Sequence, residues 1–448
     1  MNKLEKRTAL SLAAVYAVRM LGLFMILPVL PLYVTHFEEA TPFLIGLAIG
    51  IYGLTQASFQ IPLGLLSDRF GRKKIIIGGL LVFALGSVVA ALSDNIYSII
   101  LGRAIQGMGA IAAATMALAA DLTEENNRAK VMAGIGMTIG IAFAVAMIIG
   151  PLINEWYGLS GIFWITALLA LVGIALVIFV VPQPKRLYHH RDAGVLGDYI
   201  LPTLKNPSLL RMNAGVFVLH MIMTANFTVL PLIFRDQIGL SSADHWKIYL
   251  PVFGLSFIAA VPLIIIAEKY QKIKQMLVGT VFLLALAQLC MAFDTEQNWW
   301  LLLWFLAFFV SFNFLEAIQP SLVAKYADVS IKGTAMGVFS TAQFLGIFIG
   351  GVAGGLLLEN GSASWVFLFG CIGAVIWLVL TISLPSPKFY KSHLLKLSQT
   401  MLDDTQATTL ALNDIAGIKE VAIAIDEGVA YLKIDKTELN EESLLRFQ

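Results

Sequence analysis

Charged residues are scarce in this sequence, and cysteine is almost absent. Asp, Glu, Lys and Arg make up 13% of its 448 residues, whereas ordinary soluble domains hold about a quarter. Apolar residues make up 58%, and the mean hydropathy is +0.82. A net charge of +1 gives no reason to expect nucleic acid as a partner. Cys290 and Cys371 stand alone in apolar runs, which excludes a disulfide framework.

Groups that carry enzyme chemistry are also missing. The sequence shows no activated nucleophile, no cluster with metal-ligand spacing and no phosphate-binding loop. We therefore expect neither an enzyme nor a chain with a cofactor or a metal site. The interest lies in the apolar runs and in the few polar residues inside them.

Twelve apolar runs are long enough to cross a bilayer, which needs about 20 residues per helix. They lie near 9–34, 43–66, 74–93, 95–119, 130–154, 161–182, 209–234, 248–267, 275–293, 299–324, 333–358 and 363–384. The first run lacks a small-residue cleavage site and is interpreted as a retained spanning helix. The lipid bilayer is thus the first expected partner.

Lys and Arg alternate with acidic residues from one connection to the next. The basic connections include 3–7, 69–74, 128–130, 185–191, 269–274, 325–332 and 388–391. Because basic loops stay in the cytoplasm, both termini are expected there. The basic segment 185–208 divides the spans into six and six, so we expect an N-terminal bundle over 1–184 and a C-terminal bundle over 209–385.

A small soluble α+β domain is expected over 393–448. Ranges 404–415 and 438–446 have helix patterns, 419–425 and 429–435 have strand patterns, and a first strand is expected within 393–400. This β-α-β-β-α order would become a ferredoxin-like sandwich with one more strand. Gln448 comes before such a strand, so the sequence is truncated, or the strand is absent or supplied by a partner.

The most specific motif is Gly64-Leu-Leu-Ser-Asp-Arg-Phe-Gly-Arg-Lys-Lys74, a tight turn with one carboxylate among cations. A loop that only sets orientation needs the cations, but not the ordered Gly64, Asp68 and Gly71. The segment resembles the cytoplasmic-loop signature of the major facilitator superfamily, and the similarity extends over the whole membrane region. The resemblance implies two six-helix bundles that transport by alternating access.

The resemblance also assigns a conformational switch to this loop. Asp68 would face the start of the eleventh span near Gly333 and Thr334, where a helix N-terminus favours an anion, and would stabilise the outward-open state. The full set expected in the switch is Gly64, Asp68, Arg69, Gly71, Arg72, Asp121 and Arg128. The second-half counterpart, residues 267–272, is degenerate, which suggests asymmetric gating.

Two further segments resemble motifs of the same family. Arg103, inside the fourth span, matches an arginine thought to influence a nearby protonation, although snorkelling towards an interface is an alternative. Gly140 to Gly150-Pro151 partly matches the glycine-rich signature of proton-driven antiporters. A close-packed, kinked helix would explain the same residues without antiport.

Other polar residues inside the spans are candidate site residues. Glu316 is the expected proton-coupling carboxylate, with Asn313 on the same helical face, although it could instead bond a neighbouring helix. His220 could titrate near neutral pH or be a hydrogen-bonded core histidine. Arg19 could bind an anionic substrate or form a structural ion pair. Gln56 and Asn226 are expected to line the cavity.

The C-terminal segment resembles heavy-metal-associated domains in residues 412–421 and 429–435. Those domains bind metal through paired cysteines, and the matching stretch 401–404 contains none. Self-association or binding of a regulator is expected instead.

The whole pattern resembles the bacterial drug and proton antiporter branch, in the inner membrane. We therefore expect proton-coupled efflux of a small, drug-like molecule, with Glu316 or Asp121 and Arg103 as proton-sensitive groups. A metabolite or sugar symporter or uniporter and a membrane sensor that signals through its C-terminal domain remain alternatives.

Overall fold

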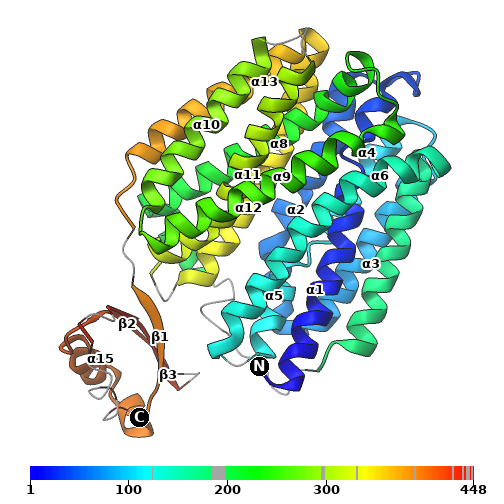
Figure 1. Cartoon of the computed structure of the whole chain (residues 1–448). Coiled ribbons are helices and arrows are strands. Elements are labelled where there is room, and N and C mark those ends of the chain that lie inside the picture. The colour runs from blue at the N-terminus through cyan, green and yellow to red at the C-terminus, as the bar shows by residue number, and fades with distance from the viewer. Residues whose placement is uncertain are drawn as a thin grey trace.

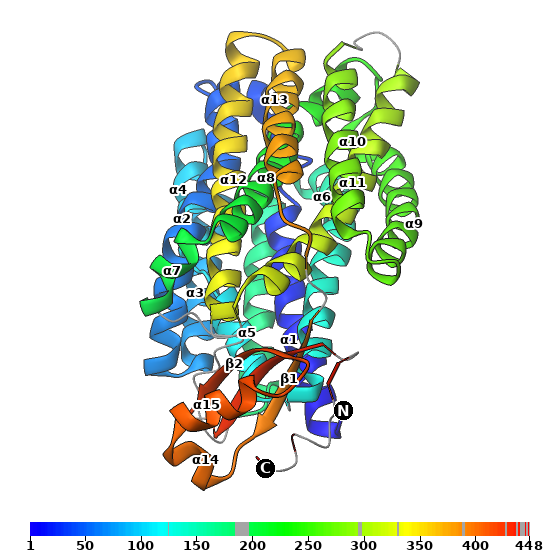
Figure 2. The ribbon, with the colours of Figure 1, turned by 90° about the vertical axis from the view of Figure 1, so that its left-hand side faces the viewer.

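Two bundles of long helices lie side by side, and a small domain with strands lies beyond one end of them (Figures 1 and 2). The computed structural model describes the chain except residues 124, 184–196, 294–297, 329–330, 388–389, 426–427, 436–437, 440–443, 445–446 and 448. The N-terminus and the small domain lie at the same end. This end, where α2 turns into α3, is called the Gly71 end, and the opposite one the Pro42 end.

The first half of the chain forms the N-terminal bundle. Its helices are α1 (Lys3–Phe24), α2 (Pro42–Phe70), α3 (Arg72–Ala91), α4 (Ile96–Met108), α5 (Ala112–Asp121) and α6 (Glu125–Ala175), with short helices η1 (Leu30–Thr35) and η2 (Leu176–Val180). The caps follow the sequence: Thr41 accepts a hydrogen bond from the amide of Leu44, and Pro42 occupies the first turn of α2. Gly71, with a φ of 97°, ends α2 and reverses the chain into α3.

The second half forms the C-terminal bundle. It consists of α8 (Pro207–Asp236), α9 (Trp246–Lys269), α10 (Ile273–Phe293), α11 (Asn298–Tyr326), α12 (Lys332–Asn360) and α13 (Ala363–Ile382). Two short helices, η3 (Gly197–Tyr199) and α7 (Ile200–Lys205), precede it, and η4 (Ser242–Asp244) precedes α9. Of the expected linker 185–208, residues 185–196 lie outside the described residues, and residues 197–208 are described.

Twelve spans are present, although the described residues contain only eleven long apolar helical segments. The 51 residues of α6 would be roughly 75 Å long at 1.5 Å per residue, more than twice the hydrocarbon core. Gly158 divides them with a φ of 65°, so α6 contains the fifth and sixth spans. The fourth span is also broken, between α4 and α5 around Gly109.

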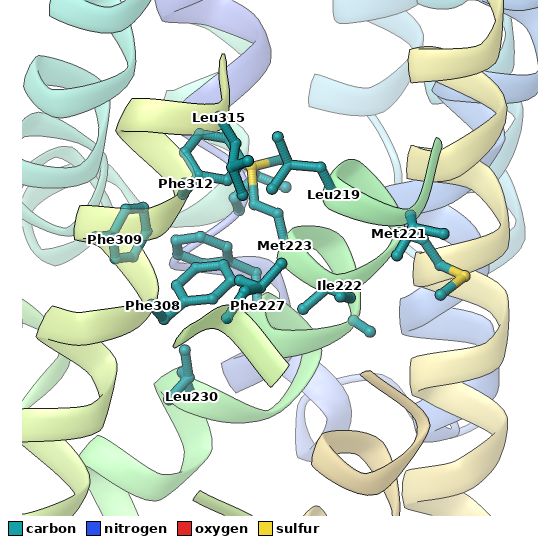
Figure 3. Packing of buried hydrophobic residues seen from close by; sticks show 14 of the residues in the cluster. Leu219, Met221, Ile222, Met223, Phe227, Leu230, Phe308, Phe309, Phe312 and Leu315 are labelled. Carbon is teal, nitrogen blue, oxygen red and sulfur yellow. The ribbon is translucent and has the colours of Figure 1, made fainter. Parts of the chain in front are cut away.

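Aromatic side chains fill the interior of the C-terminal bundle. Phe308, Phe309 and Phe312 of α11 converge on Met223 and Phe227 of α8 (Figure 3). The rings meet mainly edge to face, for example Phe309 and Phe227 with centroids 6.4 Å apart. This packing holds α8 and α11 in a fixed relation.

The two bundles meet closely along α2 and α12, at positions nearer the Pro42 end. A Cβ atom on Gly351 of α12 would lie 2.5 Å from the carbonyl oxygen of Gly46, and one on Gly50 of α2 would lie 2.7 Å from that of Phe348. Such backbone approach requires glycine. Glu359 of α12 also accepts a hydrogen bond of 2.9 Å from the amide of Phe43, at the start of α2. We call this contact the α2–α12 seam.

A second contact between the bundles involves α6. Phe143 of α6 packs against Phe253 of α9 and Phe227 of α8, with centroids 5.5 and 6.0 Å apart. Near the kink of α6, Asn154 accepts a hydrogen bond of 2.8 Å from Tyr33 and lies 3.5 Å from Ser242. The bundles are therefore joined on two sides.

The C-terminal domain contains a three-stranded antiparallel sheet. Its strands β1 (Lys391–Lys396), β2 (Ile418–Ala424) and β3 (Val429–Ile434) are arranged in the order β1-β3-β2, and α14 (Gln399–Asp403) and α15 (Thr405–Asn413) connect β1 to β2. Leu395, Leu412 and Leu432 share one apolar core. The helix expected over 438–446 lies mostly outside the described residues.

This domain contacts the membrane part of the chain at the end of α11. Lys433 of β3 donates a hydrogen bond of 2.6 Å to the carbonyl oxygen of Ala327, just past α11, and forms an ion pair of 2.8 Å with Glu420 of β2. An ammonium group at a helix C-terminus is electrostatically favourable. Burial, and then the charge of Glu420, raise the pKa of Asp328 next to this contact, while Lys433 opposes the shift.

We predict that acid strengthens this docking. A raised pKa means that the docked form binds the proton of Asp328 more tightly, so docking should strengthen as the pH falls from neutrality towards the ordinary value of 3.8. Pulsed EPR between labels on the exposed residues Tyr270 and Leu410, with both native cysteines replaced, should show a growing close population. The same pH dependence in Asp328→Asn would contradict the assignment.

We also predict that a side chain at Gly351 opens the α2–α12 seam. Gly351→Leu cannot fit against the Gly46 carbonyl, so labels on Glu39 and Asn360 should move apart in pulsed EPR. Gly140→Leu is the matched control, because a Cβ there meets open space. An unchanged distance in Gly351→Leu would show that the seam does not depend on glycine.

Candidate functional site

The switch motif forms a charge cluster at the Gly71 end of the N-terminal bundle. Arg72, with a side chain only 2% exposed, pairs with Asp68, contacts Asp121 at 3.1 Å and donates a hydrogen bond of 2.8 Å to Ser67. Gly64 allows α2 to approach Ala113 of α5. The cluster thus joins the ends of α2, α3 and α5.

One expectation about this cluster differs from the structure. Within the described residues Asp68 pairs with Arg72 of its own bundle, and no hydrogen bond or ion pair links it to α12 near Gly333 and Thr334. The reason is geometric: the α2–α12 seam brings the bundles together nearer the Pro42 end. The expected contact would require the bundles to approach each other at the Gly71 end instead. The side chain of Arg128 lies outside the described residues, and Arg69 is exposed beside Phe70.

The second half has its own ion pair at the equivalent place. Glu268, in the last turn of α9, accepts hydrogen bonds from Lys325 of α11 at 2.9 Å and from Ser321 at 3.1 Å. The family motif is degenerate in residues 267–272, but the Glu268–Lys325 ion pair still joins the ends of α9 and α11. The carboxylate of Glu268 is 41% exposed, so this pair is much more accessible to solvent than the cluster of Arg72, Asp68, Asp121 and Ser67, which we call the Arg72 cluster.

Two guanidinium groups are buried inside the N-terminal bundle. Arg19 of α1 is fully buried and donates from one nitrogen to Tyr52 at 2.7 Å and to Gln56 at 2.6 Å. Arg103 of α4, 1% exposed, donates to Gln106 at 2.8 Å and lies 4.9 Å above the ring of Tyr52. Arg103 therefore does not snorkel to an interface. Tyr52, which sequence reasoning did not single out, contacts both.

A polar cluster in the C-terminal bundle joins three helices. His220 of α8 lies 3.6 Å from the carboxylate of Glu316 on α11. The amide nitrogen of Gln343 on α12 lies 2.7 Å from Nε2 of His220 and 3.4 Å from Glu316. Glu316 is thus not a lone carboxylate, and its side chain is 39% exposed. The sequence indicated His220 and Glu316 separately, and it gave no signal for Gln343 beyond a polar residue in an apolar helix.

The remaining candidates are placed differently. Asn313 donates a hydrogen bond of 2.9 Å to Ser256 of α9, away from the partners of Glu316. Asn226 is fully buried, and neither polar atom of its amide has a partner among the described residues. A Cβ atom on Gly150, before Pro151, would lie 2.5 Å from the carbonyl oxygen of Met25, so this glycine allows close packing. A Cβ atom on Gly140 would meet open space, so Gly140 brings no helices together in this conformation.

Comparison with known proteins gives the family. The model of the Major Facilitator Superfamily matches residues 12–293 and 215–399. This chain belongs to that superfamily. It is similar to the inner membrane transport protein YajR of Escherichia coli K12, with 46% identity over 97% of this chain and 96% of that one. The multidrug resistance protein MdtH of Yersinia enterocolitica is 24% identical over 79% of this chain and 89% of that one.

A solved structure supports the fold. A bacterial homologue of the human lysosomal transporter Spinster, in an inward-facing and occupied conformation, gives a TM-score of 0.68 at 12% identity, over 85% of this chain and 97% of that one. A superfamily member with two six-helix bundles is a multi-pass membrane protein and a secondary transporter. The Arg72 cluster, the buried arginines and the His220–Gln343–Glu316 cluster are the places where its mechanism is to be sought.

We predict that the two helix-end clusters differ in their contribution to stability. Asp121→Asn leaves a buried guanidinium without one of its carboxylates and should cost about 3 kcal/mol. Glu268→Gln, at an exposed pair, should cost about 1 kcal/mol or less. Unfolding in detergent, followed by tryptophan fluorescence, measures both. Equal losses would show that the Arg72 cluster is not a buried unit.

Proposed function

We propose that this chain is a proton-coupled antiporter that exports a small, drug-like molecule from a bacterium by alternating access. The observation that carries the proposal is the His220–Gln343–Glu316 cluster, because it holds two groups that can exchange protons within the membrane part of the chain. Similarity to the inner membrane transport protein YajR and to the multidrug resistance protein MdtH supports an inner-membrane location and a drug-like substrate. Lys and Arg in the connections support cytoplasmic termini.

The hydrogen bonds of His220 define how a proton could be held. Its Nδ1 lies 3.1 Å from the carbonyl oxygen of Val216, which can only accept, so Nδ1 carries the hydrogen. In the neutral ring, Nε2 then accepts from the amide of Gln343. A proton on Nε2 would remove that acceptor, turn the amide of Gln343 and pair the ring with Glu316. A proton on one group would thus change the charge and the hydrogen bonds that the other group meets.

Gln343 links this pair to the contact between the bundles. The next residue on α12, Phe344, packs against Tyr52 of the N-terminal bundle with ring centroids 6.3 Å apart. A Cβ on Gly53 of α2 would lie 2.5 Å from the carbonyl oxygen of Phe344. A rotation of the Gln343 side chain would thus act on α2 through the neighbouring residue Phe344. Protonation of the pair could in this way shift the balance between the inward-facing and outward-facing states. Asp68 and Arg72 would set the same balance from the Gly71 end, and Arg103 would tune it electrostatically.

The C-terminal domain would act as an accessory to this cycle. Its strand order β1-β3-β2 fits the first three strands of a ferredoxin-like sheet. Lys433 ties it to the end of α11, three turns beyond Glu316. A regulator, or a second copy of the domain, could act on the transporter through this contact.

We predict that Glu316→Gln abolishes substrate-driven proton movement, because the pair loses its carboxylate. The test uses the full chain in vesicles, with an interior pH dye and a panel of lipophilic cations and metabolites. Glu155→Gln, the same change at an exposed position near the kink of α6, should leave the flux intact.

The outcomes separate the alternatives. Protons that move opposite to the substrate indicate antiport, and protons that move in the same direction as the substrate indicate symport. Substrate movement without proton movement indicates a uniporter. No flux of any kind in the full-length chain would favour a sensor. Unchanged proton movement in Glu316→Gln would remove the proposed proton site.

A further inference from the structure

The membrane interior of the N-terminal half carries positive charge without a negative partner. In the described part of this half, the acidic residues lie near helix ends or in connections: Glu5, Glu38, Glu39, Asp68, Asp94, Asp121, Glu125 and Glu155. Arg19 and Arg103 lie within helices of this half, and both are buried. A charge in hydrocarbon is costly unless it is paired or faces a cavity, so these two groups need an explanation.

Arg103 is accounted for by the protein itself. Its Nε donates to the carbonyl oxygen of Ala48 at 3.3 Å and its Nη1 to Gln106, which is itself held by Ser87 at 2.7 Å. The ring of Tyr52 lies against the guanidinium. Carbonyl, amide and aromatic groups together solvate this charge.

Arg19 is not satisfied in the same way. One nitrogen, Nη2, donates to Tyr52, Gln56 and, at 3.4 Å, to the carbonyl oxygen of Gly109. Nε and Nη1 are buried and have no hydrogen-bond partner among the described residues. Buried donors without acceptors are unfavourable. The arrangement leaves most of the guanidinium ready for an acceptor that the described residues of the bundle do not supply.

The surroundings indicate what kind of acceptor fits. Gly109 lies in the break between α4 and α5, and broken spans line ligand sites in transporters. The ring of Phe83 lies 5.6 Å from the guanidinium carbon, and Tyr52 and Gln56 are fully buried beside it. A charged donor in an aromatic setting suits a carboxylate on an apolar body.

We infer that Arg19, with Tyr52 and Gln56, forms a binding site for a small organic anion that carries a carboxylate. The inference deepens the proposed transport function and rests on it, because it names the substrate class. Tyr52 covers Arg19 and packs against Phe344 of α12, so the anion enters when α2 and α12 separate. Through Phe344 and Gln343, the anion site and the His220–Glu316 pair act on the same helix.

Three probes of one shape test the charge preference. Benzoate, benzamide and benzamidine present a negative, a neutral and a positive group on the same ring. With the full chain in detergent at constant ionic strength, benzoate should raise the unfolding temperature saturably, and the other two should not. Equal stabilisation by benzamide or benzamidine, or none by benzoate, overturns the inference.

Two variants test the residue. Arg19→Gln should abolish stabilisation by benzoate, and Arg19→Lys, which keeps the charge but loses the planar group, should weaken apparent affinity about tenfold. Arg235→Gln, which removes an arginine paired with Asp236, should bind as before. If Arg19→Gln does not fold, the lysine variant decides: unchanged affinity for benzoate refutes the site.

A last variant separates this inference from the proposed function. Glu316→Gln should bind benzoate while it loses proton movement. Benzoate binding that depends on Arg19, together with intact proton movement in Glu316→Gln, would refute only the proton site. Proton movement that requires Glu316, without any effect of benzoate, would refute only the anion site.

Discussion

The close approach of α2 and α12 is the interaction on which the rest of the structure depends. Apolar side chains do not drive helices together in lipid, so two bundles associate only where their surfaces fit. At Gly46, Gly50 and Gly351 the backbones themselves touch, and no side chain could be inserted. Separating the two helices would break this contact as a whole, because backbone atoms form it. In the proposed alternating access the contact would be closed in one state and open in the other.

Helix α12 makes three separate contacts. A face of α12 that includes Gly346, Gly350 and Gly354 packs against α8 of its own bundle, and Gly351 meets α2 of the other bundle. Gln343, nearer the Gly71 end, contacts His220 and Glu316. Because a packed helix moves as a unit, a change at any one face alters the other two. The His220–Glu316 pair and the α2–α12 seam are thus connected through one helix.

The sequence predicted what local physics determines and missed what depends on neighbours. Span length and basic connections predicted the twelve spans, and the resemblance of residues 64–74 to a family signature predicted the Arg72 cluster. Gln343 and Tyr52 could not be found, because their partners lie on helices more than 25 residues away. The expectation of close packing at Gly140 depended on neighbours in the same way, because a glycine allows close packing only where another helix faces it. No described residue faces Gly140 in this conformation. Asp68 was expected to contact the start of α12 in the other bundle. Such a contact depends on which end of the bundles is closed, and the sequence does not determine that.

Charge balance adds a constraint on the transport cycle. Glu316 has a potential counter-ion within the protein, because the ring of His220 lies 3.6 Å from its carboxylate. Arg19 has no such partner among the described residues, so in the proposed anion site its charge would be balanced only while an anion is bound. If the carrier changes between its inward-facing and outward-facing states while the Arg19 site is empty, an unpaired guanidinium stays in a low-dielectric interior. Reorientation of the loaded carrier then has the lower barrier, and the return step with an empty site has the higher one.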